Sequence, residues 1–290
     1  FHIFIKDMKL DNNLTLKNLF IENNAGTVTA TNVIIADGIA AVRDRYDGSF
    51  GGAIGCFVRK VDSQQINPTL YITNCTFINN TAVYGGAIFM ESGTLNITDS
   101  RFENNHADNF GGAIGLFPGS TAIIENTVFV NDYSTSNAGG AVYAANSKLT
   151  FNNNTIQNCS ATFGGGICDL NSSVTISLLM ALNNTANYEG GVIYKMYGTV
   201  NISNSKFNNN KAKNGGAIFV DDSESFSLIF NDFIGNSAAI CGGAVYSILN
   251  SKSNFLENNY VNNTAIMEVN MYSSDSYSLQ FGSGDYIAVS

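Results

Sequence analysis

The sequence predicts an all-β fold, a parallel β-helix solenoid with about 26 residues per coil. The first observation behind this prediction is a repeated Gly-Gly corner. Gly-Gly-Ala-Ile begins at Gly51, Gly85, Gly111 and Gly215, and close variants begin at Gly139, Gly164, Gly190 and Gly242. The steps between the eight copies are 34, 26, 28, 25, 26, 25 and 27 residues. Self-similarity at a nearly fixed period is the signature of a solenoid.

A second motif recurs in each repeat: an apolar residue, Asn three residues later and a small residue two further on. The clearest copies are Phe77-Asn80-Ala82, Phe102-Asn105-Ala107, Phe207-Asn210-Ala212 and Phe233-Asn236-Ala238. In stacked coils, equal positions lie above one another, so we expect an internal Phe column and an Asn amide ladder. Asp132 and Cys159 replace the Asn in two copies and are expected to be weak rungs.

Short alternating apolar segments precede this second motif. Examples are Leu70/Ile72, Leu95/Ile97, Leu149/Phe151 and Val200/Ile202, and alternation with a period of two indicates strands. No segment has a convincing helical period. Each coil should therefore hold one strand before an Asn turn and a second strand after the Gly-Gly corner. A third short strand in the variable link is left open. The Gly pair allows a sharp turn with positive φ.

The ends of the chain depart from the repeat. We expect one β-helix over residues 1–272, in which residues 1–40 form irregular, shortened or capping coils. A solenoid needs such caps because an open end exposes apolar core and unpaired strand edges. Residues 273–290 leave the pattern and are interpreted as a tail that caps the rod or pairs with a neighbouring subunit.

Two insertions within residues 42–68 interrupt the first coil that has a corner. One covers residues 42–49, and the other lies between Cys56 and Pro68. They contain three of the four arginines of the chain, Arg43, Arg45 and Arg59. Insertions in solenoids often form a binding face, so these arginines are candidate interface residues. The alternative is a solvated surface loop.

An aromatic column follows the Ala-Ile pairs. Its members are Phe89, Tyr143, Cys168, Tyr194, Phe219 and Tyr246. Because successive strand residues face opposite sides, the Ile column and this column cannot both point inward. The outer one should form an exposed apolar ladder, which makes Phe89, Tyr143, Tyr194, Phe219 and Tyr246 candidate interface residues. The alternative is that turns or termini of the chain cover the column.

Composition excludes some partners. The chain of 290 residues is 44% hydrophobic and 13% charged, with 28 Gly and 2 Pro. Its net charge of -9 argues against binding to nucleic acid, which requires clustered Lys and Arg. No run of 18 apolar residues occurs, so no membrane-spanning helix is expected. Residues 1–7 are apolar but too short for a signal peptide, as in a processed product.

Ten Asn-x-Ser/Thr sequons are candidate glycosylation sites in a secretory pathway. Their asparagines are Asn13, Asn74, Asn79, Asn96, Asn153, Asn158, Asn171, Asn183, Asn201 and Asn262. Compositional bias toward Asn, Ser and Thr is the alternative explanation. The five cysteines lack the spacing of a metal site, and we expect one or two disulfides, with at least one thiol left over because the number is odd. The disulfide candidates are Cys56, Cys75, Cys159 and Cys168, with Cys56 and Cys75 at the base of the second insertion.

The combination of Phe-x-x-Asn with Gly-Gly-Ala-Ile resembles the repeat of the chlamydial polymorphic outer-membrane proteins. Similar repeats occur in adhesin-like surface proteins of other microbes. The resemblance covers about residues 50–265. It implies a right-handed parallel β-helix, an extracellular or cell-surface location, and adhesive or structural work. It implies no catalytic residue.

Parallel β-helices also include enzymes that cut acidic polysaccharides, which makes catalysis a competing hypothesis. The only histidines are His2 and His106, which makes a Ser-His-Asp triad improbable. Asp221, Asp222 and Glu224 lie together, but neighbouring coils have Met196 and Ile248 at the position of Asp221. A solvated acidic turn explains these acids better than a glycosidase pair. We therefore expect no enzyme, no cofactor and no metal site.

The sequence thus favours an extracellular or cell-surface structural or adhesive protein, with assembly as a subunit of a filament or surface coat as one form of that function. The expected partners are further copies of the chain or other surface proteins, with N-linked glycans. The alternative function is that of a carbohydrate-binding or polysaccharide-cleaving β-helix.

Overall fold

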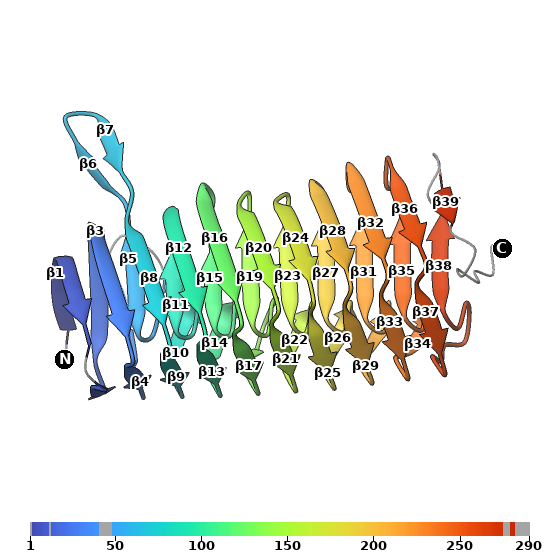
Figure 1. Ribbon diagram of the computed structural model, residues 1–290, viewed down its shortest axis with the longest axis horizontal. Helices are drawn as coiled ribbons and strands as arrows, with labels where there is room; N and C mark the ends of the chain where they lie inside the picture. Colours follow the sequence, from blue (N-terminus) through green and yellow to red (C-terminus); the bar gives the residue numbers. More distant parts are fainter. Residues whose placement is uncertain (1, 12, 41–47, 275–278, 282–290) are drawn as a thin grey trace.

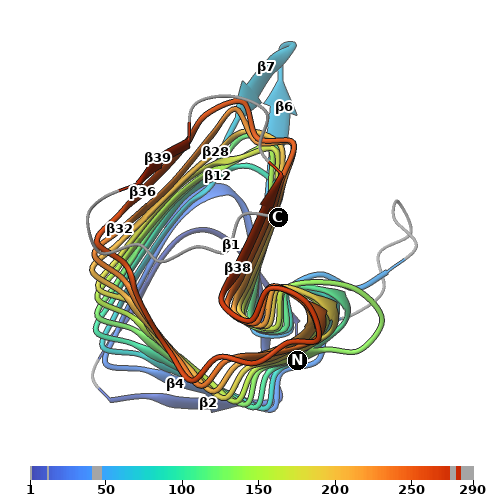
Figure 2. The same cartoon turned by 90° about the vertical axis from the view of Figure 1, so that its right-hand side faces the viewer.

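The computed structural model describes residues 2–11, 13–40, 48–274 and 279–281. Its coils stack along one axis, from β1 (His2–Leu10) at one end to β38 (Met271–Ser274) and β39 (Leu279–Phe281) at the other (Figure 1). Seen along that axis, successive coils superimpose (Figure 2). Neighbouring coils pair as parallel strands, so the predicted parallel β-solenoid is confirmed.

The largest sheet has two strands per coil. The strands after the Gly-Gly corners are β5 (Ile54–Phe57), β11 (Ile88–Met90), β15 (Ile114–Leu116), β19 (Val142–Ala145), β23 (Ile167–Leu170), β27 (Ile193–Met196), β31 (Ile218–Asp221) and β35 (Val245–Ile248). The strands that follow them are β8 (Thr69–Thr73), β12 (Gly93–Thr98), β16 (Ser120–Glu125), β20 (Lys148–Asn152), β24 (Ser173–Ser177), β28 (Thr199–Ser203), β32 (Ser225–Ile229) and β36 (Ser253–Leu256). The second set contains the Leu-x-Ile segments recognised in the sequence.

A second sheet carries the Phe position of each coil. Its strands are β2 (Thr15–Lys17), β4 (Ile34–Ala36), β9 (Thr76–Ile78), β13 (Arg101–Glu103), β17 (Val128–Val130), β21 (Thr155–Gln157), β25 (Met180–Leu182), β29 (Lys206–Asn208), β33 (Asp232–Ile234) and β37 (Asn259–Val261). The buried rings stack as predicted: Phe77 and Phe102 lie 4.7 Å apart with an interplanar angle of 3°. This column fills the interior of the coil.

A third sheet answers the open question about an additional strand. It consists of β10 (Thr81–Tyr84), β14 (His106–Phe110), β18 (Tyr133–Ser134), β22 (Ser160–Phe163), β26 (Thr185–Glu189), β30 (Lys211–Asn214) and β34 (Ser237–Cys241). These strands occupy the link between the Asn turn and the corner.

The predicted amide ladder runs between the second and third sheets. Asn184 donates to Asn210 at 3.0 Å, Asn210 to Asn236 at 2.9 Å and Asn236 to Asn263 at 3.1 Å. All four side chains are buried, and each also donates to a backbone carbonyl. The ladder therefore satisfies polar groups that the turn would otherwise bury unpaired.

The two glycines of the corner have different tasks. Gly85 has a φ of 62°, a left-handed conformation that favours Gly. A Cβ on Gly86 would overlap the carbonyl oxygen of Gly112 in the next coil. The second Gly is thus required by the close stacking of corners rather than by the turn itself.

The ends agree in part with expectation. Strand β1 pairs with β3 (Phe20–Thr31) at a step of 18 residues, from His2 to Phe20, whereas β3 pairs with β5 at a longer step, from Ile21 to Ile54, so only the first coil is shortened. At the other end, β38 pairs with β35 and β39 pairs with β36. The sheet therefore continues beyond the boundary expected at residue 272, because the tail supplies residues in register with the previous coil.

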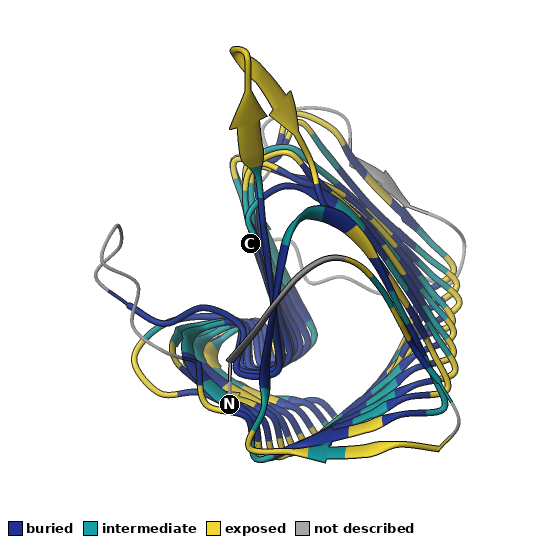
Figure 3. Cartoon of the chain, turned by 90° about the vertical axis from the view of Figure 1, so that its left-hand side faces the viewer, coloured by how far each residue is buried: buried dark blue, intermediate teal, exposed yellow. Residues whose placement is uncertain are grey.

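The second insertion forms a β-hairpin of β6 (Arg59–Val61) and β7 (Gln64–Ile66). The hairpin projects from the side of the rod near its N-terminal end and is exposed along its whole length (Figures 1 and 3). Its two strands pair only with each other among the described strands. It is therefore an addition to the solenoid rather than part of a coil.

Candidate functional site

The aromatic column lies on the outer side of its strands, while the Ile column faces the interior of the coil. The exposed ladder predicted from the sequence is nevertheless wrong. Phe89, Tyr143 and Phe219 are buried, and Tyr194 and Tyr246 are half-buried. The alternative, that the chain covers its own column, describes the structure better.

The cover is made by residues that end the strands of the third sheet or immediately precede the corners. Phe50 lies 4.7 Å from Phe89 between ring centroids, and Phe110 lies 4.4 Å from Tyr143. Phe163 packs on Tyr194 at 5.1 Å. A second apolar core therefore lies outside the coil, between two layers of strands.

This outer core opens into a cavity beside the hairpin. The cavity has a volume of about 590 Å³ and is lined mostly by apolar groups. Its aromatic lining consists of Phe50, Phe57, Tyr84, Phe89, Phe110 and Phe117. Concave apolar sites with a few polar groups are the usual form of a binding pocket. We take this cavity, with the hairpin, as the candidate functional site.

Polar groups occur at a few places around the cavity. The Glu91 carboxylate accepts a hydrogen bond from the backbone N–H of Val58 at 3.0 Å, where the chain enters the hairpin. The Tyr84 hydroxyl accepts one from Asn109 at 3.4 Å. Gln65, an exposed residue of β7, also lines the cavity. The hairpin is thus joined to the cavity by both packing and hydrogen bonding.

Only part of the predicted interface is brought to this site. Phe89 lines the cavity, and the exposed Arg59 lies on β6 of the adjoining hairpin. Arg43 and Arg45 lie outside the described residues. Tyr143, Tyr194, Phe219 and Tyr246 lie in later coils and do not line the cavity.

Four aromatic residues of the cavity were not predicted from the sequence: Phe50, Tyr84, Phe110 and Phe117. A signal was present, because the residue directly before the Gly-Gly corner is aromatic at 50, 84, 110 and 163. The same position is Ala138 in one intervening coil and Glu189 and Asn214 in later coils.

The acidic residues considered for catalysis are placed as expected from the repeat. Asp221 pairs in register with Met196 and Ile248, so no acid flanks it in its column. Its pKa is raised by burial. Asp222 and Glu224 instead lie with Tyr197 on an open polar depression of about 570 Å³.

His106 is used structurally. Its ring stacks on Tyr133 at 4.4 Å, and its Nε2 lies 2.6 Å from the hydroxyl oxygen of Thr135. Burial lowers its pKa, against the opposing charge of Asp108.

Comparison with protein families agrees with this geometry. A family model described as the right-handed β-helix region matches residues 101–261, more than half of the chain. The chain belongs to the right-handed β-helix family. The Chlamydia polymorphic membrane protein repeat matches residues 74–91, which confirms the resemblance seen in the corner and Asn motifs.

Three curated proteins resemble parts of this β-helix. The probable autotransporter YfaL of Escherichia coli is 31% identical over 220 residues, 66% of this chain and 17% of the relative. Metabotropic glutamate receptor-like protein R of Dictyostelium discoideum is 31% identical over 136 residues, 43% of this chain and 8% of the relative. The P protein of the same receptor-like group is 35% identical over 101 residues, 35% of this chain and 6% of the relative. The chain therefore spans less than a fifth of each relative. No solved structure shows significant similarity to it.

Most sequon asparagines of this β-helix lie in its turns. Eight of the ten asparagines have positive φ, and only Asn96 and Asn201 lie on strands instead. Asn tolerates this left-handed conformation better than most residues. The Ser or Thr two positions later usually begins the next strand, as Thr155 and Thr185 do. All sequon asparagines except the half-buried Asn96 are exposed, so both glycosylation and turn chemistry fit their positions.

The predicted disulfides are not formed. Cys56, Cys75, Cys159, Cys168 and Cys241 are all buried free thiols. Cys56 pairs in register with Met90 on the next strand, and Cys168 pairs with Tyr143 on the previous one. Neither thiol has a cysteine as that strand partner. Burial raises the pKa of Cys56 to about 12, which disfavours the reactive thiolate.

The described residues contain no helix with the length and hydrophobicity that a membrane crossing requires. No cluster of three or more His, Cys, Asp or Glu side chains suited to a metal ion occurs in the same ranges.

Proposed function

We propose that this chain is a non-enzymatic part of a cell-surface protein, in which the β-helix is a rigid spacer and the aromatic cavity binds a protein partner. The observation that carries the proposal is the cavity of about 590 Å³ beside a projecting hairpin near one end of the rod. The similarity to an autotransporter and to polymorphic membrane protein repeats supports a surface location.

The chemistry of the cavity indicates the kind of partner. Six aromatic rings and a small number of polar groups suit an inserted aromatic or aliphatic side chain better than a polyanion. The net charge of -9 also disfavours nucleic acid and other polyanions. We therefore assign the site to protein–protein adhesion.

The use of titratable side chains supports the non-enzymatic part of the proposal. His106 is stacked and hydrogen-bonded, and Asp221 has apolar neighbours in its column. Acid–base catalysis requires two such groups that converge on one reacting position.

The first prediction concerns the mouth of the cavity. We expect Gln65→Trp to reduce adhesion at least about tenfold, since an indole on β7 would fill the entrance. Gln64→Trp is the matched control, because adjacent strand residues point to opposite sides and Gln64 does not line the cavity. Beads coated with the chain would be tested on immobilised extracellular and cell-surface proteins and on one another.

Three outcomes separate the possibilities. Loss of adhesion with Gln65→Trp alone supports the site, and clustering of the beads with one another identifies the partner as a second copy of the chain. Equal adhesion by both variants would remove the cavity from the function. Binding to acidic polysaccharides that neither variant changes would favour the carbohydrate alternative, with the polar depression at Tyr197 as its site.

A further inference from the structure

One interior column of the β-helix contains two opposite charges. The column lies two residues after the Ile of each corner, and its members are Cys56, Met90, Leu116, Ala144, Asp169, Lys195, Val220 and Ser247. Asp169 on β23 and Lys195 on β27 are direct register partners in adjacent parallel strands. Ala144 and Val220 flank the pair, so neither offers it another charge.

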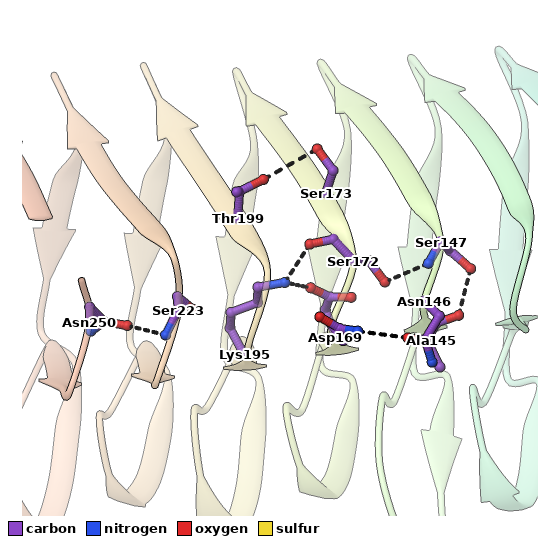
Figure 4. A network of polar contacts seen from close by, with 11 residues as sticks. Ala145, Asn146, Ser147, Asp169, Ser172, Ser173, Lys195, Thr199, Ser223 and Asn250 are labelled. Carbon is purple, nitrogen blue, oxygen red and sulfur yellow. Dashed lines mark hydrogen bonds and ion pairs between the residues drawn. The ribbon is translucent and has the colours of Figure 1, made fainter. Parts of the chain in front are cut away.

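The two side chains are in contact and enclosed. The Lys195 Nζ touches the Asp169 Oδ2 (Figure 4), and their side chains are 0% and 1% exposed. The Lys195 Nζ also donates a hydrogen bond to the backbone carbonyl oxygen of Ser172 at 2.8 Å. The Asp169 Oδ1 is buried without a hydrogen-bond partner among the described residues. The carboxyl group thus has one oxygen at the amine, and Ser172 adds a smaller hydrogen-bonding contribution that favours its charged form.

Burial of this pair favours its uncharged forms. Desolvation raises the pKa of Asp169 and lowers the pKa of Lys195, and in both cases it outweighs the opposing attraction between the two groups. Two buried ions lose hydration that their mutual attraction restores only in part. The pair is therefore shifted toward a carboxylic acid and an amine with a free lone pair.

We propose that Lys195 and Asp169 are joined by an intramolecular isopeptide bond. The amine nitrogen of Lys195 attacks the Cγ of Asp169, a C–N bond forms, and the Cγ–O bond of the acid breaks. The leaving hydroxyl takes one proton from the nitrogen and departs as water. The reaction consumes one acid and one amine, produces one amide and one water, and needs no oxidant or other reactant.

The surrounding backbone fits the amide product. The amide nitrogen keeps one N–H, and the Ser172 carbonyl oxygen that already accepts from Lys195 Nζ can accept from it. Contact between the reacting groups in a fixed, enclosed geometry supplies the proximity that amide formation lacks in water. Exclusion of water from the interior also protects the product from hydrolysis.

The bond would close a ring of one complete coil, because Asp169 and Lys195 are 26 residues apart. In a solenoid each coil contacts only its neighbours, so the rod can unwind from either end. A covalent link between two coils in the middle of the rod would block that process there. A cross-link also restricts the unfolded chain, as a disulfide does.

Mass spectrometry of the unmodified 290-residue chain tests the proposal directly. The chain would be produced in a host without N-glycosylation and its denatured mass measured. We expect a mass lower than that of the sequence by one water molecule. Cleavage after glutamate should release residues 126–189 and 190–224 as one branched peptide, since Glu125, Glu189 and Glu224 bound them.

Two variants complete the test. Lys195→Met keeps a straight side chain but removes the nucleophile, so the full sequence mass and two separate peptides are expected. Lys148→Met, at an exposed position on β20, should leave the mass deficit unchanged. If the unmodified chain has its full mass and the two peptides separate, Asp169 and Lys195 are in contact without a covalent bond and the proposal is wrong. That outcome needs no variant, so a folding defect in Lys195→Met cannot obscure it.

Discussion

At the scale of single residues, Asp132 shows how the interior ladder tolerates an exception. Its Oδ1 accepts from the backbone N–H of Asn105 at 2.8 Å and from the Asn105 side chain at 2.9 Å. Its Oδ2 is buried without a hydrogen-bond partner among the described residues, where an Asn would place its amide nitrogen. Burial raises the pKa of Asp132 from 3.8 to about 8. A protonated Asp132 therefore takes the place of an amide.

The second prediction follows from this substitution. Between pH values of 3.8 and about 8, the folded chain holds a proton on Asp132 that the unfolded chain has released. Stability therefore falls as the pH rises through this window. Asp132→Asn removes the titration and restores the amide, so we expect it to stabilise the fold by roughly 1–3 kcal/mol at high pH and by less at pH 5. Thermal unfolding followed by circular dichroism between pH 5 and 9 measures the difference.

Asp99→Asn is the control for this experiment. Asp99 is exposed and accepts a hydrogen bond from the Asn126 side chain at 3.1 Å in an outer turn. Its replacement should change the unfolding temperature little at any of these pH values. A pH-independent effect of Asp132→Asn would contradict the raised pKa.

The pair of Asp169 and Lys195 marks a limit of reading one coil at a time. Each residue alone looks like a surface charge in a strand. Their burial becomes apparent only when coils are aligned, because the same position is Leu116, Ala144 or Val220 elsewhere. Alignment of repeats by the Gly-Gly corner would have found two opposite charges at one interior position in neighbouring coils.

At the scale of elements, the corner could be predicted from the sequence and the third sheet could not. The corner could be predicted because stacking imposes the same residue in every coil, as at Gly86 and Gly112. The third sheet could not, because its strands vary from Tyr133–Ser134 to the five residues of His106–Phe110. This sheet covers the aromatic column and so decides which residues are exposed. The column was predicted to be exposed because the sequence prediction did not include the third sheet.

The third prediction tests the assignment of tasks to glycines. Gly86→Ala should destabilise the fold by about 3 kcal/mol or more, since its Cβ would meet backbone oxygens of Gly112 and His106 that cannot move separately. Gly235→Asn is the control, because Gly235 has a φ of 65° at a position where other coils have Asn209 and Asn262, also with positive φ. Its added Cβ would meet only the side chain of Asn209.

Chemical or thermal unfolding of the two variants distinguishes the roles. We expect Gly235→Asn to be neutral or slightly stabilising. Similar losses in both variants would mean that positive φ, rather than corner stacking, limits substitution.

At the scale of the whole molecule, the coils behave as interchangeable layers of one rod. Along one column the successive residues are Tyr194, Phe219 and Tyr246, and along another they are Phe207, Phe233 and Tyr260. If the middle coil were removed, an aromatic ring would still lie on an aromatic ring in both columns. Stability of such an array is the sum of terms for single coils and for contacts between neighbours. The candidate site, by contrast, depends on the inserted hairpin of β6 and β7, which has no counterpart in later coils among the described residues.

The last prediction tests this modularity. Deletion of residues 215–241 removes one whole coil and joins Asn214 to Gly242, so that Tyr246 stacks on Tyr194 and Tyr260 on Phe207. We expect a folded rod that is shorter by about 4.8 Å, one strand spacing, with a moderately lower unfolding temperature. Deletion of residues 215–227 removes half a coil, places the following strands out of register and should leave the chain unfolded or aggregated. Small-angle X-ray scattering and circular dichroism measure both results. If the whole-coil deletion fails as the half-coil deletion does, the coils are not independent layers, and long-range coupling along the rod must contribute to its stability.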